Sequence, residues 1–94
     1  MKLIVTDAAV SWFRDEMHVK DGEGVRIFAR YGGCGTVQSG FSLGIAKEHP
    51  REIGISATSS GILFFIETDD MWYLNDSDLT VDYDRAKDEI VFHV

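Results

Sequence analysis

Apolar residues at helical spacing mark one amphipathic helix near the start of the chain. Its stripe follows the i, i+3, i+7 spacing that buries one helix face. The stripe consists of Val10, Phe13 and Met17, with Ala9 beside Phe13. Thr6 or Asp7 has the side-chain oxygen that caps a helix N-terminus. The Asp-Gly-Glu-Gly sequence at 21–24 predicts the end of the helix and a turn.

The rest of the chain has the pattern of short strands separated by turns. The segments typical of strands are 25–31, 41–46, 53–58, 62–67, 79–83 and 90–94. The segment 62–67 is nearly all apolar, which predicts a central strand covered on both sides. Thr68-Asp69-Asp70 can cap a short helical turn that continues to Leu74. We therefore predict an α+β fold with short, mostly antiparallel strands in small packed sheets, an N-terminal helix and a short second helical turn.

Length and composition limit the classes of protein to consider. The chain has 94 residues, which predicts a single domain over 1–94. Nine basic and 16 acidic residues give a net charge of −7, which argues against nucleic acid and anionic membranes as partners. The longest apolar run, 62–66, is far shorter than the roughly 20 residues that span a bilayer. A single cysteine excludes an internal disulfide and is typical of a reducing compartment, so we expect a cytoplasmic protein.

The negative charge is concentrated in one part of the chain. The segment 67–89 holds nine acidic and two basic residues, and the remainder of the chain is neutral. One interpretation is a solvated face that keeps the protein soluble. The alternative is a docking face for a basic partner.

The most informative chemistry lies around the only cysteine, Cys34, between Gly33 and Gly35. Glycine permits close backbone approach, so backbone N–H groups near the sulfur could stabilise a thiolate. A thiolate binds soft metals and attacks electrophiles. The alternative is a small buried cysteine beside an ordinary hairpin turn.

The other reactive side chains give weaker signals. His18, His49 and His93 have no partner at metal-ligand spacing, so we interpret them as surface residues. The aromatic residues Trp12, Trp72 and Tyr73 are interpreted as core or interface packing rather than a ligand cage. The sequence contains no recognised catalytic or phosphate-binding motif. An enzyme is therefore the least supported class, and we predict that the protein is not one.

Several segments in a fixed order resemble a known family. The order is Ile4-Val5-Thr6-Asp7-Ala8-Ala9, Gly32-Gly33-Cys34, Ser39-Gly40-Phe41-Ser42-Leu43, Gly61-Ile62-Leu63-Phe64-Phe65-Ile66, Tyr73-Leu74-Asn75-Asp76 and Leu79-Thr80-Val81-Asp82-Tyr83. Over nearly the whole chain this order resembles the HesB-like family, the A-type iron–sulfur carriers. The resemblance implies short β-strands with flanking helices, assembly into dimers, and binding of iron or an iron–sulfur cluster that is passed to recipient proteins.

The resemblance also identifies where this chain departs from the family. Cys34 matches the first of three family cysteines, whereas the C-terminal Cys-Gly-Cys has no counterpart here. The segment 35–38 is longer than its family equivalent. A cluster normally has four protein sulfur ligands. A two-fold dimer would supply two Cys34 thiolates and leave a [2Fe–2S] cluster half-liganded.

Three functional hypotheses follow. The first is a homodimeric HesB-like protein that binds iron or a labile [2Fe–2S] cluster through Cys34, with Gly33 and Gly35 beside it, and works with an iron–sulfur assembly or recipient protein. The second is a protein-interaction module without metal, which uses the acidic segment or an apolar patch around Trp72. The third is a redox-sensing thiol at Cys34.

Overall fold

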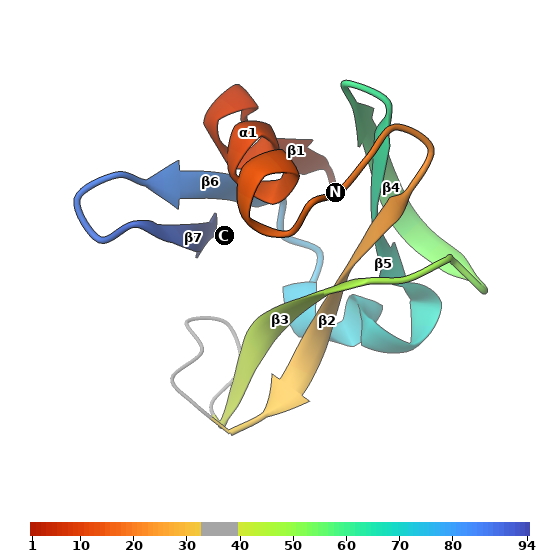
Figure 1. Ribbon diagram of the computed structural model, residues 1–94. Helices are drawn as coiled ribbons and strands as arrows, with labels where there is room; N and C mark the ends of the chain where they lie inside the picture. The colour runs from red at the N-terminus through yellow and green to blue at the C-terminus, as the bar shows by residue number, and fades with distance from the viewer. Residues whose placement is uncertain (33–39) are drawn as a thin grey trace.

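The computed structural model describes residues 1–32 and 40–94, which form two small β-sheets, an α-helix and a 3-10 helix (Figure 1). The elements in chain order are β1 (Leu3–Val5), α1 (Asp7–Glu16), β2 (Gly24–Tyr31), β3 (Phe41–Lys47), β4 (Ile53–Ser59), β5 (Ile62–Glu67), the 3-10 helix η1 (Thr68–Leu74), β6 (Leu79–Asp84) and β7 (Glu89–His93). All six strands predicted from the sequence are present within a residue or two of their expected bounds.

The strands form one sheet of three and one of four. The order is β1-β6-β7 in the first sheet and β3-β2-β5-β4 in the second. Three of the five pairs are antiparallel, namely β2 with β3, β4 with β5, and β6 with β7. The pairs β1 with β6 and β2 with β5 are parallel. The predicted α+β fold with small, mostly antiparallel sheets is therefore confirmed.

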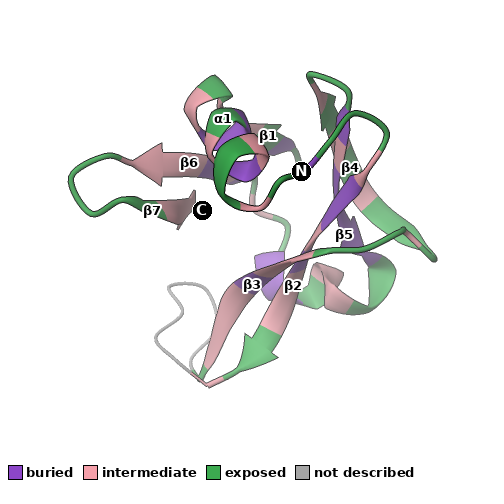
Figure 2. Ribbon diagram, viewed as in Figure 1, coloured by how far each residue is buried: buried purple, intermediate pink, exposed green. Residues whose placement is uncertain are grey.

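The core lies where α1 and the inner strands of both sheets meet (Figure 2). Helix α1 contributes the buried side chains Ala9, Val10 and Phe13. Phe13 packs edge-on against Phe64 of β5, with ring centroids 5.2 Å apart. Five of the six residues of β5 are buried, as expected for a strand that lies between β2 and β4.

Two local expectations were wrong, and one short strand was missed. Helix α1 ends at Glu16, not at 21–24, because His18 adopts the left-handed conformation with φ of 55°. Strand β1 was not predicted, since three residues are too few to show a period. The N-cap of η1 is Glu67 without a side-chain cap, so the 68–70 segment does not cap the helix as expected. The Glu67 carboxylate instead binds the loop before β4, as described below.

Candidate functional site

The predicted ligand Cys34 and its neighbours Gly33 and Gly35 lie outside the described residues. The structure does describe the residues on either side of this segment, Gly32 and Gly40. At these points the backbone N–H of Gly32 donates to the carbonyl oxygen of Gly40 over 2.6 Å. Both glycines have positive φ, 100° and 82°, a conformation that other residues rarely adopt. This hydrogen bond thus joins the two described ends of the chain just beyond β2 and β3.

Aromatic side chains gather at this end of the hairpin. Tyr31 and Phe41 are register partners across β2 and β3, and their rings meet edge-to-face with centroids 5.5 Å apart. Phe41 also meets the ring of Trp72 from η1, with centroids 5.0 Å apart. We call Tyr31, Phe41 and Trp72 the aromatic surface. Tyr31 is 88% exposed and Trp72 is 49% exposed, so much of their ring area faces solvent.

The aromatic surface is anchored to the core at one end. Trp72 meets Tyr73 with ring centroids 6.0 Å apart, and Tyr73 is only 3% exposed. Exposed aromatic rings that are held in place offer a large apolar area together with polar edges. This combination suits binding to another macromolecule better than it suits bond-breaking chemistry.

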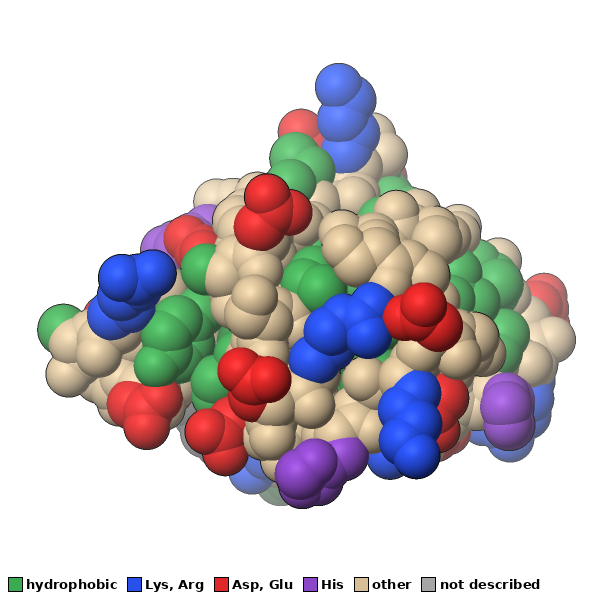
Figure 3. Space-filling model, turned by 45° about the horizontal axis from the view of Figure 1, so that its top comes forward, with side chains coloured by type: hydrophobic (Ala, Val, Ile, Leu, Met, Phe, Trp, Pro, Cys, Tyr) green, Lys and Arg blue, Asp and Glu red, His purple; other side chains and the backbone are tan. Residues whose placement is uncertain are grey.

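The acidic segment 67–89 does not form one continuous docking face. Most of its acids make specific contacts: Asp70 pairs with Arg26, Asp78 with the N-terminus, Asp82 with Thr6, Asp84 with the N–H groups of Ala86 and Lys87, and Asp88 with Tyr83. Acidic and basic side chains are also interspersed over the face that Figure 3 shows. Within the described residues, Asp69 and Asp76 form no ion pair and make no side-chain hydrogen bond, and both are exposed.

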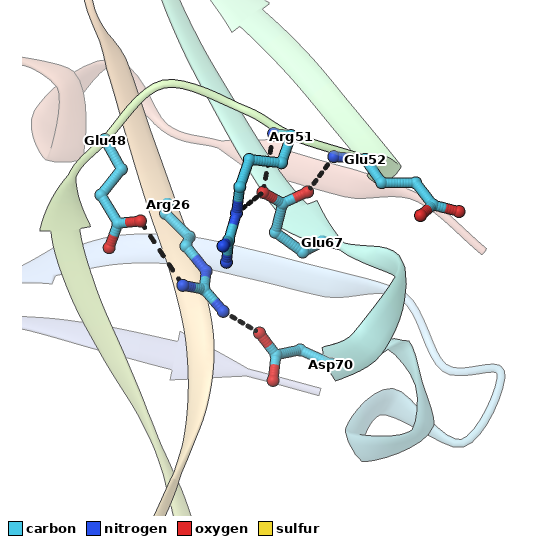
Figure 4. A network of polar contacts seen from close by, with 6 residues as sticks. All are labelled: Arg26, Glu48, Arg51, Glu52, Glu67 and Asp70. Atoms are coloured by element: carbon cyan, nitrogen blue, oxygen red, sulfur yellow. Dashed lines mark hydrogen bonds and ion pairs between the residues drawn. The ribbon is translucent and has the colours of Figure 1, made fainter.

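Glu67 is the one buried charged residue in the described part of the chain, with 5% exposure. Its carboxylate accepts the backbone N–H groups of Arg51 (2.9 Å) and Glu52 (2.7 Å), as Figure 4 shows. These hydrogen bonds, the Arg51 N–H first among them, hold the pKa of Glu67 below its usual value. Glu67 therefore fixes the loop before β4 to the end of β5.

Arg26 forms ionic contacts close to Glu67 (Figure 4). Its Nη2 lies 2.9 Å from Asp70 of η1, and its Nη1 lies 3.5 Å from Glu48. The hydrogen bond with Asp70 is the main reason why the pKa of Arg26 is raised. This contact ties η1, and therefore Trp72, to strand β2. Its role is structural support for the aromatic surface.

Within residues 1–32 and 40–94, no three His, Cys, Asp or Glu side chains come together in a way that could hold a metal ion. His93 is exposed, as the sequence predicted, and so are His18 and His49. In the same part of the chain, no helix combines the length and the apolar character needed to cross a bilayer.

The fold and the segment order define a class of protein. A family model described as iron-sulphur cluster biosynthesis matches residues 1–94. The chain therefore belongs to the iron-sulphur cluster biosynthesis family, and the HesB-like resemblance inferred from its sequence is confirmed. The fold also matches the crystal structure of Escherichia coli SufA, which is involved in biosynthesis of iron-sulfur clusters. That match has a TM-score of 0.71 and 23% identity, and it covers 98% of this chain and 79% of SufA.

Curated relatives are similar over their whole length. A Bacillus subtilis protein named pyruvate dehydrogenase inhibitor is 47% identical over 92 residues, which is 98% of this chain and 97% of that protein. An uncharacterized protein of Staphylococcus saprophyticus is 34% identical over 95 residues, with the same coverage. The family and the name of the Bacillus relative thus suggest different activities for one fold.

Proposed function

We propose that this protein is not an enzyme but an inhibitor that binds pyruvate dehydrogenase, built on the fold of an iron–sulphur cluster biosynthesis protein. The observation that carries the proposal is the 47% identity, over nearly the full length of both chains, to the Bacillus subtilis pyruvate dehydrogenase inhibitor. The aromatic surface supports it, because anchored and exposed Tyr and Trp side chains are typical of the centres of protein interfaces. This proposal corresponds to the second hypothesis drawn from the sequence, a protein-interaction module without metal, and adds pyruvate dehydrogenase as the partner.

The test is a titration of the purified protein into a pyruvate dehydrogenase assay, together with a direct binding measurement. We expect saturable binding, and inhibition that follows the fraction of enzyme bound. The Cys34→Ser variant serves as a matched comparison, since inhibition by a protein surface does not require the thiol. Full enzyme activity and no binding at inhibitor concentrations well above that of the enzyme would refute the proposal.

A second candidate function comes from the family match over residues 1–94 and from Cys34 in its Gly-Gly-Cys sequence. In this candidate, a cytoplasmic homodimer binds iron or a labile [2Fe–2S] cluster through two Cys34 thiolates and exchanges it with an assembly or recipient protein. Two thiolates supply half of the usual four ligands, so the rest would come from the partner protein or a small thiol.

Anaerobic reconstitution with ferrous iron and sulfide tests this second candidate. We expect visible absorption and an iron content near one cluster per dimer in the wild type, and loss of both in Cys34→Ser. Sedimentation of the unloaded and loaded protein measures the oligomeric state directly. Equal iron and sulfide in the wild type and the variant would exclude Cys34 as the ligand.

A further inference from the structure

We propose that the aromatic surface, together with Asp69 and Asp76, is the face that docks on pyruvate dehydrogenase. The enzyme would meet it with an apolar pocket edged by lysine and arginine side chains. This inference rests on the proposed function and adds to it the location of the interface and the chemistry of the partner's surface.

The geometry of η1 places an acid and an aromatic ring on the same face. A 3-10 helix has three residues per turn, so residues three apart lie above one another. Asp69 and Trp72 are three apart and both are exposed, whereas Asp70 and Tyr73, on the next face, contact Arg26 and the core. The exposed face of η1 therefore presents a carboxylate directly beside the indole.

The turn after η1 carries a second exposed acid. Asn75 ends the helix in the left-handed conformation with φ of 49°, and the N–H of Ser77 donates to the carbonyl oxygen of Leu74 over 2.9 Å, so the chain turns immediately after the helix. Asp76 follows this turn and is exposed. The segment 68–84 contains no lysine or arginine. Trp72 thus has an acid on each side along the chain and no base in its own segment.

Together these features match a partner of one kind. The apolar ring area of Tyr31, Phe41 and Trp72 needs an apolar counterpart. The exposed acids Asp69 and Asp76 flank Trp72 along the chain, whereas the exposed Arg30 precedes Tyr31. A surface that presents lysine and arginine around an apolar pocket is complementary in both respects. The edge-to-face contacts of Trp72 with Phe41 and Tyr73 limit its motion in the free protein, which lowers the entropic cost of binding.

The experiment measures the affinity of purified pyruvate dehydrogenase for four alanine variants. Tyr31→Ala and Trp72→Ala remove the most exposed rings of the aromatic surface, and each is expected to weaken binding about tenfold to thirtyfold. Ile4→Ala and Val94→Ala are matched controls, because these side chains are 46% and 49% exposed on β1 and after β7. We expect both controls to bind within about twofold of the wild type. Thermal melts check that every variant is folded.

The charged rim is tested in the same assay with two double variants of equal net charge. Asp69→Asn with Asp76→Asn is expected to weaken binding several-fold. Asp15→Asn with Glu89→Gln, two exposed acids on α1 and β7, is expected to leave it unchanged. If Tyr31→Ala and Trp72→Ala bind pyruvate dehydrogenase as tightly as the wild type does, this inference is wrong and the proposed function stands. A wild type that does not bind pyruvate dehydrogenase would overturn the proposed function itself.

A second copy of this chain is the competing occupant of the aromatic surface. Sedimentation of the wild type and of Trp72→Ala distinguishes a second copy of the chain from pyruvate dehydrogenase as the occupant. If Trp72→Ala converts a dimer into a monomer and inhibits pyruvate dehydrogenase as well as the wild type does, the surface is a homodimer interface and the inference is wrong. We expect instead that Trp72→Ala leaves the sedimentation coefficient unchanged.

Discussion

Thr6 joins the start of α1 to β6 through a single hydroxyl group. Its oxygen accepts the backbone N–H of Ala9 over 3.2 Å, and the hydroxyl donates to Asp82 over 2.8 Å. The second contact is the main reason why the pKa of Asp82 is lowered. Thr6 is thus both a helix cap and a contact between the helix and the three-stranded sheet.

We predict that Thr6→Ala lowers the free energy of unfolding by about 1 kcal/mol, the usual cost of losing an N-cap. For a domain of this size that corresponds to a fall in Tm of roughly 4–8 °C. Thr6→Ser keeps the hydroxyl and is the control, which we expect to retain most of the stability. Thermal or denaturant unfolding measures the difference. Equal stability of Thr6→Ala and the wild type would show that the hydroxyl is dispensable.

Glu67 makes the stability of the protein depend on pH in the acid range. Its pKa is lowered in the folded protein, so its ionised form stabilises the fold above the ordinary carboxyl pKa of about 4.3. That stabilisation is lost as the pH falls through the lowered folded pKa. We predict that Glu67→Gln is less stable than the wild type at pH 7 and that the difference shrinks as the pH falls below about 4.3.

The control for this prediction is Glu52→Gln, an exposed neighbour that contributes only its backbone to the contact. We expect its unfolding curve between pH 7 and pH 3 to follow the wild type. Chemical denaturation at several pH values measures both variants. A constant difference between Glu67→Gln and the wild type across this range would mean that ionisation of Glu67 contributes nothing.

At the scale of single residues, the sequence supports some assignments and not others. The cap could be narrowed to Thr6 or Asp7 because capping depends on local chemistry within one helical turn, and the structure shows Thr6 as the cap. The role of Glu67 was not predictable, since it depends on a loop 15 residues away folding back onto the end of β5. No local pattern distinguishes Glu67 from the other acids that follow it.

Strand β2 begins at a glycine that has no room for a side chain. A Cβ on Gly24 would lie 2.6 Å from the backbone carbonyl oxygen of Glu48, which cannot move without disturbing the β3 end of the sheet. The same region is held by a hydrogen bond from the Glu48 N–H to the Gly24 carbonyl over 3.2 Å. Gly24 therefore allows β2 to pass close to the chain that leaves β3.

We predict that Gly24→Ala lowers the free energy of unfolding by about 1–3 kcal/mol, the typical cost of overpacking. The matched control is Gly54→Ala in β4, where the added Cβ meets chiefly the flexible side chain of Met71. We expect the control to lose less stability, because a methionine side chain can move aside. Denaturant unfolding compares the two variants, and an equal loss in both would contradict the argument from backbone contact.

At the scale of elements, the alternation of apolar and polar residues and the turn residues were sufficient to predict the longer strands. Segments of five or more residues show their period directly, and the turn at Ser60-Gly61 separates β4 from β5. Strand β1 exists only through its parallel pairing with β6, which lies more than 70 residues later. The end of α1 depends on one residue, His18, whose left-handed conformation is not encoded by a glycine.

At the scale of the whole molecule, the charge pattern was only partly informative. The sequence showed that 67–89 carries the net charge, but most of its acids are engaged in caps, ion pairs and hydrogen bonds. Trp72 could be singled out from the sequence. That Trp72 lies beside Phe41, and Phe41 beside Tyr31, could not be predicted. These contacts depend on the register of β2 with β3 and on the packing of η1, both of which are long-range features.

The net charge of the protein would affect how fast it associates with pyruvate dehydrogenase. A net charge of −7 attracts a basic surface at long range, and added salt screens that attraction as the Debye length falls from about 10 Å at 0.1 M to about 3 Å at 1 M. We predict that the association rate constant with pyruvate dehydrogenase falls steeply with ionic strength while the dissociation rate constant changes little. Stopped-flow or surface-based kinetics over this salt range measure both constants.

The two double variants described above separate local from global charge, because each changes the net charge from −7 to −5. If Asp69 and Asp76 lie at the interface, their double variant has a shallower salt dependence than the variant of Asp15 and Glu89. The difference arises because charges close to the contact are the last to be screened as the two proteins approach. Equal slopes for the two variants would mean that attraction depends only on total charge, and would place the docking face away from η1.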